Sequence, residues 1–348
     1  MSLRRLLPAV VVLLLVLLAG EWATRRWLQT PRSARIDPRF GWVQGPGARY
    51  VQSAEGWGEY RADADGFLDR PLPPPGQGVR AVLLGDSFGQ GLQVLDRERF
   101  SETAELLMPG LHILNTAAAG RSVFHHALLA RRLQDAFAPD LVLVQLDDNK
   151  LTDIERPEDS AGAFAEFRAA AAVNRPARVR VGLASTMLRR SALLSYLRTR
   201  VEKLTRQEQQ RLTLKLTNRK PDLRDLVALP ATPRAKSLID SLVAEIQTVN
   251  PRVVLIYVPN VDYFVSPPRV SYPERRAWFH ELAAQRGLPL VDPSDAFLQS
   301  YRATGEPLHG FSNAQPGVGH VNARGHALIA NELVTVLRRE GLVRRGSR

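Results

Sequence analysis

The sequence predicts an α/β fold with a central parallel sheet of about five strands between two layers of helices. A short, continuous apolar run occurs at Ala81–Leu84, and mostly apolar runs occur at 140–146 and 252–258. Such runs are typical of strands that are buried on both faces. Segments with helical periodicity alternate with these strands, which is the order found in a doubly wound sheet. The 348 residues are enough for one large domain or two ordinary ones.

Composition excludes several classes of function. The chain is 45% hydrophobic and 24% charged, as expected for a globular protein, and its net charge is +12. A basic balance permits contact with anionic lipid, acidic glycans or nucleic acid, but no interleaved aromatic and basic pattern supports a nucleic-acid partner. The absence of cysteine excludes disulfides, thiol catalysis and Cys-ligated metals. No metal-ligand spacing is evident, so we predict neither a metal nor a cofactor, and nothing in the sequence predicts an oligomeric state.

Residues 1–29 are predicted to be a signal anchor. Leu6–Gly20 is almost wholly aliphatic and is preceded by two arginines. This run is short for a span, which needs about 20 residues, and its length also fits a signal peptide. Glu21 and Trp22 occupy the region where a small-x-small cleavage site would lie, whereas Trp22 and Trp27 suit a membrane interface. We therefore predict a single-pass protein of the cell membrane with its main domain extracytoplasmic (periplasmic), and keep a cleaved signal as the alternative.

Residues 30–78 are rich in Pro, Gly and Trp and lack a long periodic run. They are predicted to form a juxtamembrane arm with short strands around 40–43 and 58–62. The proline-rich stretch Pro71–Gly76 reads as a stiff linker at its end. The main domain is therefore expected to extend over 79–340.

Within the main domain, strands are predicted at 81–84, 112–115, 140–146, 252–258 and 288–291, and helices at 100–108, 123–137, 236–249, 273–285 and 323–338. From about 151 to 239 the alternation stops, and the sequence becomes Arg-rich and mostly helical, with one long helix predicted over 191–216. This region is expected to be a solvated helical insertion beside the sheet. The alternative is a lid, or a surface for anionic lipid or glycan.

Four loop residues form a candidate catalytic set. Ser87 follows the first strand, Gly120 follows the second, Asn149 follows the third, and His320 precedes the last helix. Because ligands bind beyond the carboxyl ends of strands in open α/β sheets, these residues are expected to converge. A serine nucleophile needs a base such as neutral imidazole, and an oxyanion needs fixed donors. The Ser87 N–H, the Gly120 N–H and the Asn149 amide are expected to supply these donors.

These residues resemble the sequence blocks of the SGNH hydrolase superfamily, the GDSL-type lipases and esterases. Gly85–Ser87 matches the first block, the stretch up to Gly120 is similar to the second, Asn149 stands where the third block has its asparagine, and His320 begins the last. Asp65–Asp69 is similar to a stretch in the arm of membrane-anchored members. The resemblance covers 60–150 and 249–337. It implies a flavodoxin-like three-layer sandwich, with Ser87 as nucleophile, His320 as base, and Gly120 and Asn149 in the oxyanion hole.

Two departures from the family pattern bear on the chemistry. Asp147 and Lys150 replace the family's Gly and Asp around Asn149. The family also has an acid three residues before its histidine, where this chain has Gly317. That acid orients the base and stabilises its cationic form. We therefore expect a Ser-His dyad, or a His320 held by a backbone carbonyl or by a carboxylate from elsewhere. The nearest preceding acids are Glu306, Asp295 and Asp292.

The resulting prediction is an exported ester hydrolase that acts through an acyl-enzyme on a small-molecule or glycan ester. One alternative is an O-acyltransferase or deacetylase acting on an envelope polysaccharide, since it would use the same acyl-enzyme. The second is a catalytically silent carbohydrate-binding or scaffold protein, since fold does not fix function. Of the other histidines, His326 is expected to pack or cap the last helix, His309 to line the entrance or to have a structural role, and His125 and His126 to be solvated.

Overall fold

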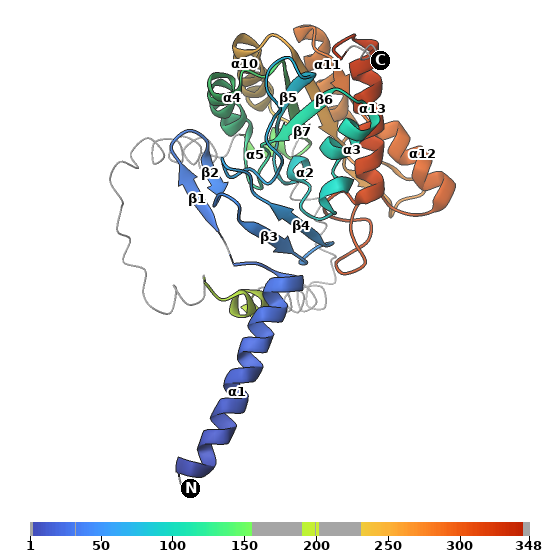
Figure 1. Ribbon diagram of the computed structural model, residues 1–348. Coiled ribbons are helices and arrows are strands. Elements are labelled where there is room, and N and C mark those ends of the chain that lie inside the picture. Colours follow the sequence, from blue (N-terminus) through green and yellow to red (C-terminus); the bar gives the residue numbers. More distant parts are fainter. Residues whose placement is uncertain (1–2, 32, 155–189, 199, 202–230, 344–348) are drawn as a thin grey trace.

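The computed structural model describes residues 3–31, 33–154, 190–198, 200–201 and 231–343 (Figure 1). The α-helix α1 (Leu3–Ala23) projects from the folded part of the chain and continues into a short π-helical turn, η1 (Thr24–Leu28). Among the described residues, one helical stretch, Leu7–Leu28, is long and apolar enough to cross a membrane. Its mean hydropathy is 2.1, and only 6% of it is buried. The predicted helical insertion at 151–239 lies mostly outside the described residues.

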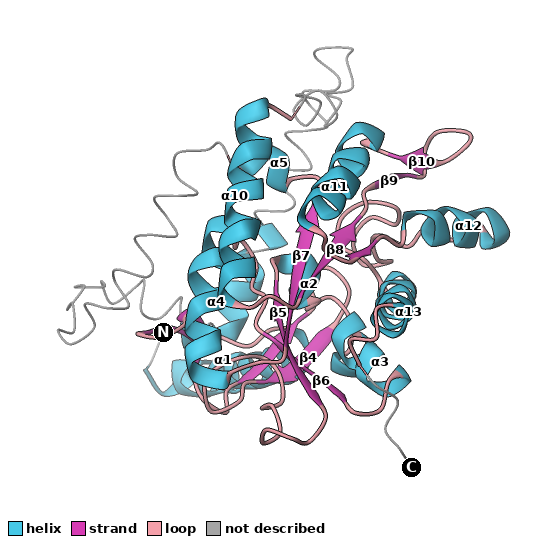
Figure 2. Cartoon of the chain, turned by 90° about the horizontal axis from the view of Figure 1, so that it is seen from above, coloured by secondary structure: helices cyan, strands magenta, loops and turns pink. Residues whose placement is uncertain are grey.

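The central sheet has five parallel strands in the order β11-β8-β7-β5-β6, which confirms the predicted fold class. The strands are β5 (Val79–Leu84), β6 (Leu111–Asn115), β7 (Leu141–Asp147), β8 (Val253–Val258) and β11 (Leu290–Val291). Numbered along the chain as strands one to five, they run 2-1-3-4-5 across the sheet, the flavodoxin-like order. Figure 2 shows helices covering both faces of this sheet.

Helices in the main domain follow the predicted alternation. They are α2 (Ser87–Gln90), the 3₁₀ turn η2 (Asp96–Glu98), α3 (Phe100–Leu107), α4 (Val123–Phe137), α5 (Lys150–Asp153), α10 (Pro233–Val249), α11 (Pro273–Arg286), α12 (Ser294–Thr304) and α13 (Ala323–Arg339). A two-stranded ribbon of β9 (Val261–Asp262) and β10 (Arg269–Val270) precedes α11. The sequence did not predict α12 or this ribbon.

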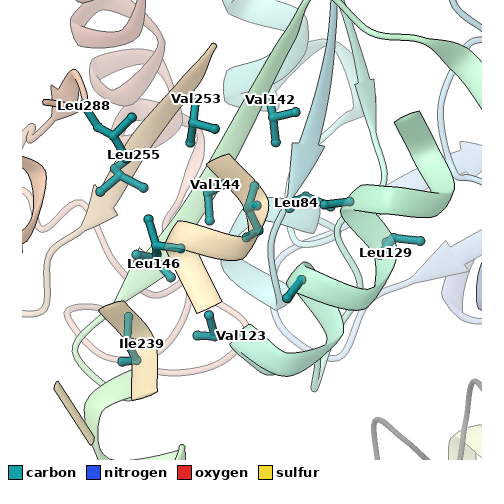
Figure 3. Packing of buried hydrophobic residues seen from close by; sticks show 14 of the residues in the cluster. Leu84, Val123, Leu129, Val142, Val144, Leu146, Ile239, Val253, Leu255 and Leu288 are labelled. Atoms are coloured by element: carbon teal, nitrogen blue, oxygen red, sulfur yellow. The ribbon is translucent and has the colours of Figure 1, made fainter. Parts of the chain in front are cut away.

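Alternate strand residues enter two separate apolar cores, because side chains along a strand point to opposite faces. On one face of the sheet, Val142, Val144 and Leu255 pack against α4, α10 and α11. Figure 3 shows part of this cluster. Leu143 and Ile256 pack on the other face against α3 and α13. Most positions of a strand buried in this way are therefore apolar, which explains the apolar runs in the sequence.

The arm consists of two antiparallel hairpins, where the sequence predicted only parts of two strands. The first pairs β1 (Ala34–Asp37) with β2 (Gly41–Gln44), and the second pairs β3 (Arg49–Gln52) with β4 (Gly58–Arg61). Both hairpins pack on the main domain. Phe40 stacks on Phe137 of α4 with ring centroids 5.6 Å apart, and the buried Tyr60 hydroxyl donates to the Gly91 carbonyl at 2.8 Å.

Candidate active site

Ser87 lies at the start of α2, directly beyond the carboxyl end of β5. The Asp86 side chain caps this short helix by accepting a hydrogen bond from the Phe88 N–H at 2.9 Å. On the other side of the turn, the buried Gln145 side chain accepts from the N–H of Asp86 at 2.9 Å and of Gly89 at 3.2 Å. These contacts fix the backbone on both sides of Ser87, so its hydroxyl has a defined position.

His320 is the hydrogen-bond partner of Ser87. Its Nε2 lies 2.9 Å from Ser87 Oγ, and its ring packs beside Phe88 with centroids 5.1 Å apart. The two residues are 233 positions apart in sequence. The structure therefore brings together a hydroxyl and an imidazole in the geometry of a nucleophile and its base.

Glu55, in the loop between β3 and β4 of the arm, holds the other side of His320. Glu55 Oε2 lies 2.6 Å from His320 Nδ1, and Glu55 Oε1 accepts from the His320 backbone N–H at 2.8 Å. The carboxylate thus binds both the ring and the main chain of one residue. The arrangement Ser87–His320–Glu55 has the connectivity of a serine-hydrolase triad, in which the acid fixes the tautomer and orientation of the base.

The acids suggested from their place in the sequence are not near His320. Asp292 bonds His280 and Arg276, and Asp295 pairs with Arg276, around a separate hollow of about 600 Å³ beside α11. Glu306 pairs with Arg324. A bare Ser-His dyad is also contradicted, because a carboxylate from the arm takes the place of the missing acid.

Gly319, in the His320 loop, leaves room for Glu55. Gly319 has φ +97°, and a Cβ at this position would collide with the Glu55 carboxylate. Gly317, which stands at the family's acid position, has φ +83° and is also in the left-handed region that glycine adopts most readily. A carboxylate from another part of the chain can therefore approach this loop and His320 closely. In the sequence, Gly317 indicated that the family's acid was missing at this position, but nothing there pointed to Glu55.

Asn313 ties the Glu55 loop to the His320 loop. Its Oδ1 accepts from the Gly56 N–H at 2.8 Å, and its Nδ2 donates to the carbonyls of Gly56 at 2.8 Å and Ser53 at 3.2 Å. From the arm side, Gln52 Nε2 donates to the Glu55 carbonyl at 2.9 Å. Glu55 is thus held by its main chain as well as by its carboxylate contacts.

Gly120 and Asn149 lie with Ser87 around one cavity of about 230 Å³. Gly120 has φ +82° in the loop after β6, and Asn149 stands at the start of α5 with its N–H donating to Asp147 Oδ1 at 2.8 Å. The structure thus brings together all four residues singled out in the sequence. The wall also includes Arg121, Val123 and Ile154 and is therefore of mixed polarity.

Lys150 connects the loops that carry these residues. Its buried ammonium pairs with Asp86, beside Ser87, and donates to the Arg121 carbonyl, beside Gly120, at 3.2 Å. It also lies 3.6 Å from Asp147 Oδ2 and directly follows Asn149. One cation thus joins the three loops, where the family has an aspartate.

The two carboxyl groups beside Lys150, those of Asp147 and Asp86, differ in pKa. Burial raises the pKa of Asp147 to about 8, which leaves this carboxyl mostly protonated at neutral pH. Burial also acts on Asp86, but the Lys150 charge outweighs it and holds the pKa of Asp86 below its usual range. Lys150 and Asp86 therefore form a buried ion pair beside Ser87, while burial favours the protonated form of Asp147.

The other histidines are structural. His326 packs on Phe100, and its Nδ1 accepts from the Phe100 N–H at 3.3 Å, as expected for a packing residue. His309 is buried and bonds Tyr263 at 3.0 Å, away from the residues that line the cavity. His125 and His126 are buried, so the expectation that they are solvated was wrong. Their helix, α4, turns them inward, and the His125 ring bonds the Ser122 hydroxyl at 2.9 Å.

The chain is an α/β protein with a five-stranded parallel sheet, and hydrogen bonds join a serine, a histidine and a carboxylate beyond the carboxyl end of β5. No protein-family model and no curated protein matches the chain. Among solved structures, it is similar to a member of the lipolytic G-D-S-L family from Veillonella parvula, with 10% identity, 75% of this chain and 100% of the other covered, and a TM-score of 0.40.

Two further solved structures are similar to the chain. A lipase/acylhydrolase from Enterococcus faecalis has 15% identity, with 78% of this chain and 100% of the other covered and a TM-score of 0.41. A catalytic mutant of an acetylxylan esterase from Geobacillus stearothermophilus has 15% identity, with 78% and 99% covered and a TM-score of 0.39.

Proposed function

We propose that the protein is an SGNH-type serine ester hydrolase that works through an acyl-enzyme on Ser87. The observation that carries the proposal is the continuous hydrogen-bonded series from Ser87 Oγ through the His320 ring to Glu55, with distances of 2.9 and 2.6 Å. A silent scaffold has no need for a hydroxyl, an imidazole and a carboxylate in this order. The absence of an acid at Gly317 favoured a silent protein, but Glu55 supplies a carboxylate to His320.

The proposed reaction has two halves. Ser87 Oγ attacks the ester carbonyl while His320 Nε2 takes its proton, and Glu55 holds the Nδ1–H and stabilises the imidazolium. The alcohol leaves with that proton, and the acyl group remains on Ser87. Water then attacks the acyl-enzyme, again losing a proton to His320, and Ser87 regains its hydrogen as the acid departs. The N–H groups of Ser87 and Gly120 and the Asn149 amide stabilise the oxyanion, and loss of one such donor costs about 10²–10³ in rate.

The protein is further proposed to stay anchored in the cell membrane by α1, with the main domain outside the cytoplasm. The end of α1 and the turn after it are bonded to the β3–β4 hairpin. Arg49 donates to the carbonyls of Arg25 and Arg26 at 2.7 Å each, and Trp57 Nε1 donates to the Trp27 carbonyl at 2.8 Å. Trp22 and Trp27, at the end of this apolar helix, are both exposed and suit a membrane interface, which favours an anchor over a removable signal.

The test is turnover of p-nitrophenyl acetate by the purified full-length protein in detergent. Ser87→Ala should abolish turnover, and Ser241→Ala, at an exposed serine of α10, should leave it unchanged. Equal turnover by Ser87→Ala would refute the proposal. A hydrolase releases acetate to water at a rate that does not depend on an added glycan. Acceleration by a polysaccharide acceptor, with acetyl recovered on the glycan, would identify a transferase instead.

A further inference from the structure

A short helical segment lies against the end of α1 that joins the folded part of the chain. It comprises residues 190–198 and 200–201, here called the collar segment, and Figure 1 shows it in yellow-green where α1 meets the folded part of the chain. The Glu21 carboxylate accepts from the N–H groups of Ala192 and Leu193 at 2.9 Å each and from the Ser191 hydroxyl at 2.7 Å. The end of α1 therefore caps the start of the collar segment.

Two more hydrogen bonds fix the collar segment in place. Arg25 donates to the Arg190 carbonyl at 2.6 Å, and Gln29 Nε2 donates to Ser195 Oγ at 2.9 Å. On the α1 side, Gly20 leaves room for the approach, since a Cβ there would lie 3.3 Å from the Leu193 side chain. The collar segment is thus docked on the stretch 20–29, at the level where the apolar part of α1 ends.

The collar segment exposes an apolar face. Leu194, Leu197 and Val201 are 43%, 49% and 61% exposed, and their spacing of three and four residues places them on one side of a helix. Trp22 and Trp27 nearby are also exposed, with their rings packed edge to face at 5.0 Å. Large apolar side chains exposed together in this way mark an interaction surface.

Basic groups accompany this apolar surface. Arg190 and Arg198 of the collar segment are exposed, and the Arg25 and Arg26 side chains are 48% and 51% exposed beside it. An apolar face with arginines at its border is the pattern of a helix that lies in a membrane interface. Tryptophan is likewise enriched at that level.

We infer that the collar segment lies in the lipid headgroup region, with Leu194, Leu197 and Val201 inserted at the boundary of the acyl chains. This inference rests on the proposed membrane anchoring by α1. Lipid is the occupant that fits, because the collar segment lies directly against the end of α1, whose apolar side chains are exposed in the same way. At about 1.5 Å per residue, the 21 residues of α1 span about 31 Å, so one end of the hydrocarbon layer falls near Glu21.

The consequence is a fixed height of the active site above the membrane. The stretch 25–27 that holds the collar also bonds Arg49 and Trp57 of the hairpin that carries Glu55. A protein held by one span alone can tilt and rotate about it. A second, interfacial contact restrains that motion and so orients the cavity beside Ser87 relative to the bilayer.

The test uses the absence of native cysteine, which allows a single fluorescent label. The full-length chain carrying Leu197→Cys is labelled with an environment-sensitive NBD dye and placed in nanodiscs of phosphatidylcholine and phosphatidylglycerol. Quenching is measured separately with lipids that carry a doxyl group near the headgroup and with lipids that carry it deep in the acyl chain. Leu14→Cys in α1 is the reference for a membrane span, and Leu106→Cys, 80% exposed on α3, is the matched leucine control away from α1.

We expect the Leu197 label to shift its emission to shorter wavelength and to be quenched by the shallow doxyl lipid. The Leu14 label should be quenched by the deep doxyl lipid, and the Leu106 label should show neither the shift nor quenching. Leu194→Cys repeats the measurement on the same face. If Leu14 is quenched and Leu197 behaves as Leu106 does, the inference is wrong and the anchor stands. A blue-shifted but unquenched Leu197 label means that protein covers this face, which also overturns the inference. An unquenched Leu14 label refutes the anchor itself.

Discussion

Replacement of Glu55 by glutamine should harm catalysis more than replacement by alanine. In Glu55→Gln, the His320 backbone N–H, which Oε1 now binds at 2.8 Å, requires an acceptor. The glutamine carbonyl oxygen satisfies it, so the amide NH₂ points at His320 Nδ1, 2.6 Å from the other carboxylate oxygen in the native protein. A donor facing Nδ1 forces the proton onto Nε2, where it blocks acceptance of the Ser87 hydroxyl proton. In alanine, both tautomers remain available.

The size of the effect follows from burial. A wrong tautomer in a fully buried triad costs about 10⁴ in kcat. The His320 and Glu55 side chains are 26% and 21% exposed, so water can compete with the misplaced amide. We therefore expect kcat to fall about 10²–10³-fold in Glu55→Gln, or about 3–4 kcal/mol, and about 10–10²-fold in Glu55→Ala, with KM little changed because neither variant touches the cavity lining.

The assay is steady-state hydrolysis of p-nitrophenyl acetate with the unfolding midpoint measured in parallel. Glu59→Gln, on the adjacent strand β4 and paired with Arg49, is the matched control and should retain full kcat. Glu55→Asp keeps the charge and should recover part of the loss. A Glu55→Gln enzyme at least as active as Glu55→Ala would refute the tautomer argument, and full activity in both would remove Glu55 from the triad.

Two further predictions concern buried charge. Lys150→Met leaves Asp86 buried without its cation, so the free energy of unfolding measured in urea titrations should fall by about 3–5 kcal/mol, and kcat should also fall. Lys236→Met is the surface control. An unchanged unfolding midpoint in Lys150→Met would contradict the role of Lys150. Burial lowers the pKa of His126 to about 3, and no hydrogen-bond partner for its ring lies among the described residues. Protons therefore favour the unfolded chain as pH falls below about 6.5, and His126→Leu should gain about 2 kcal/mol more stability at pH 5 than at pH 8. An equal gain at both pH values would contradict this linkage.

The strands of the sheet were predictable because burial on both faces produces an apolar run in the sequence, such as Leu141–Val144. Strand β11 is short and at the edge, yet the apolar residues around Leu290 were enough to place it. Helix α12 was not predicted, since its buried side is limited mainly to Phe297. The arm hairpins were only half predicted, because each strand has four residues and alternation over so few positions is a weak signal.

The site was predictable where chemistry and strand ends coincide. Ser87, Gly120 and Asn149 each follow a strand, so topology alone brings them to one edge. Glu55 was not predictable in this way, because it lies in an arm whose packing on the main domain has no sequence periodicity. Lys150 was noted only as a departure. Its role depends on Asp86 and the Arg121 carbonyl, and these meet it only in three dimensions.

The most direct test of the Ser87–His320–Glu55 assignment is labelling by a fluorophosphonate, read as the mass of the peptide that contains Ser87. We predict one adduct per chain, located on Ser87, with labelling lost in Ser87→Ala and greatly slowed in His320→Ala. Glu55→Gln should be slowed by the same factor as its kcat. An adduct on another serine, or labelling of Ser87 at the same rate without His320, would contradict the account.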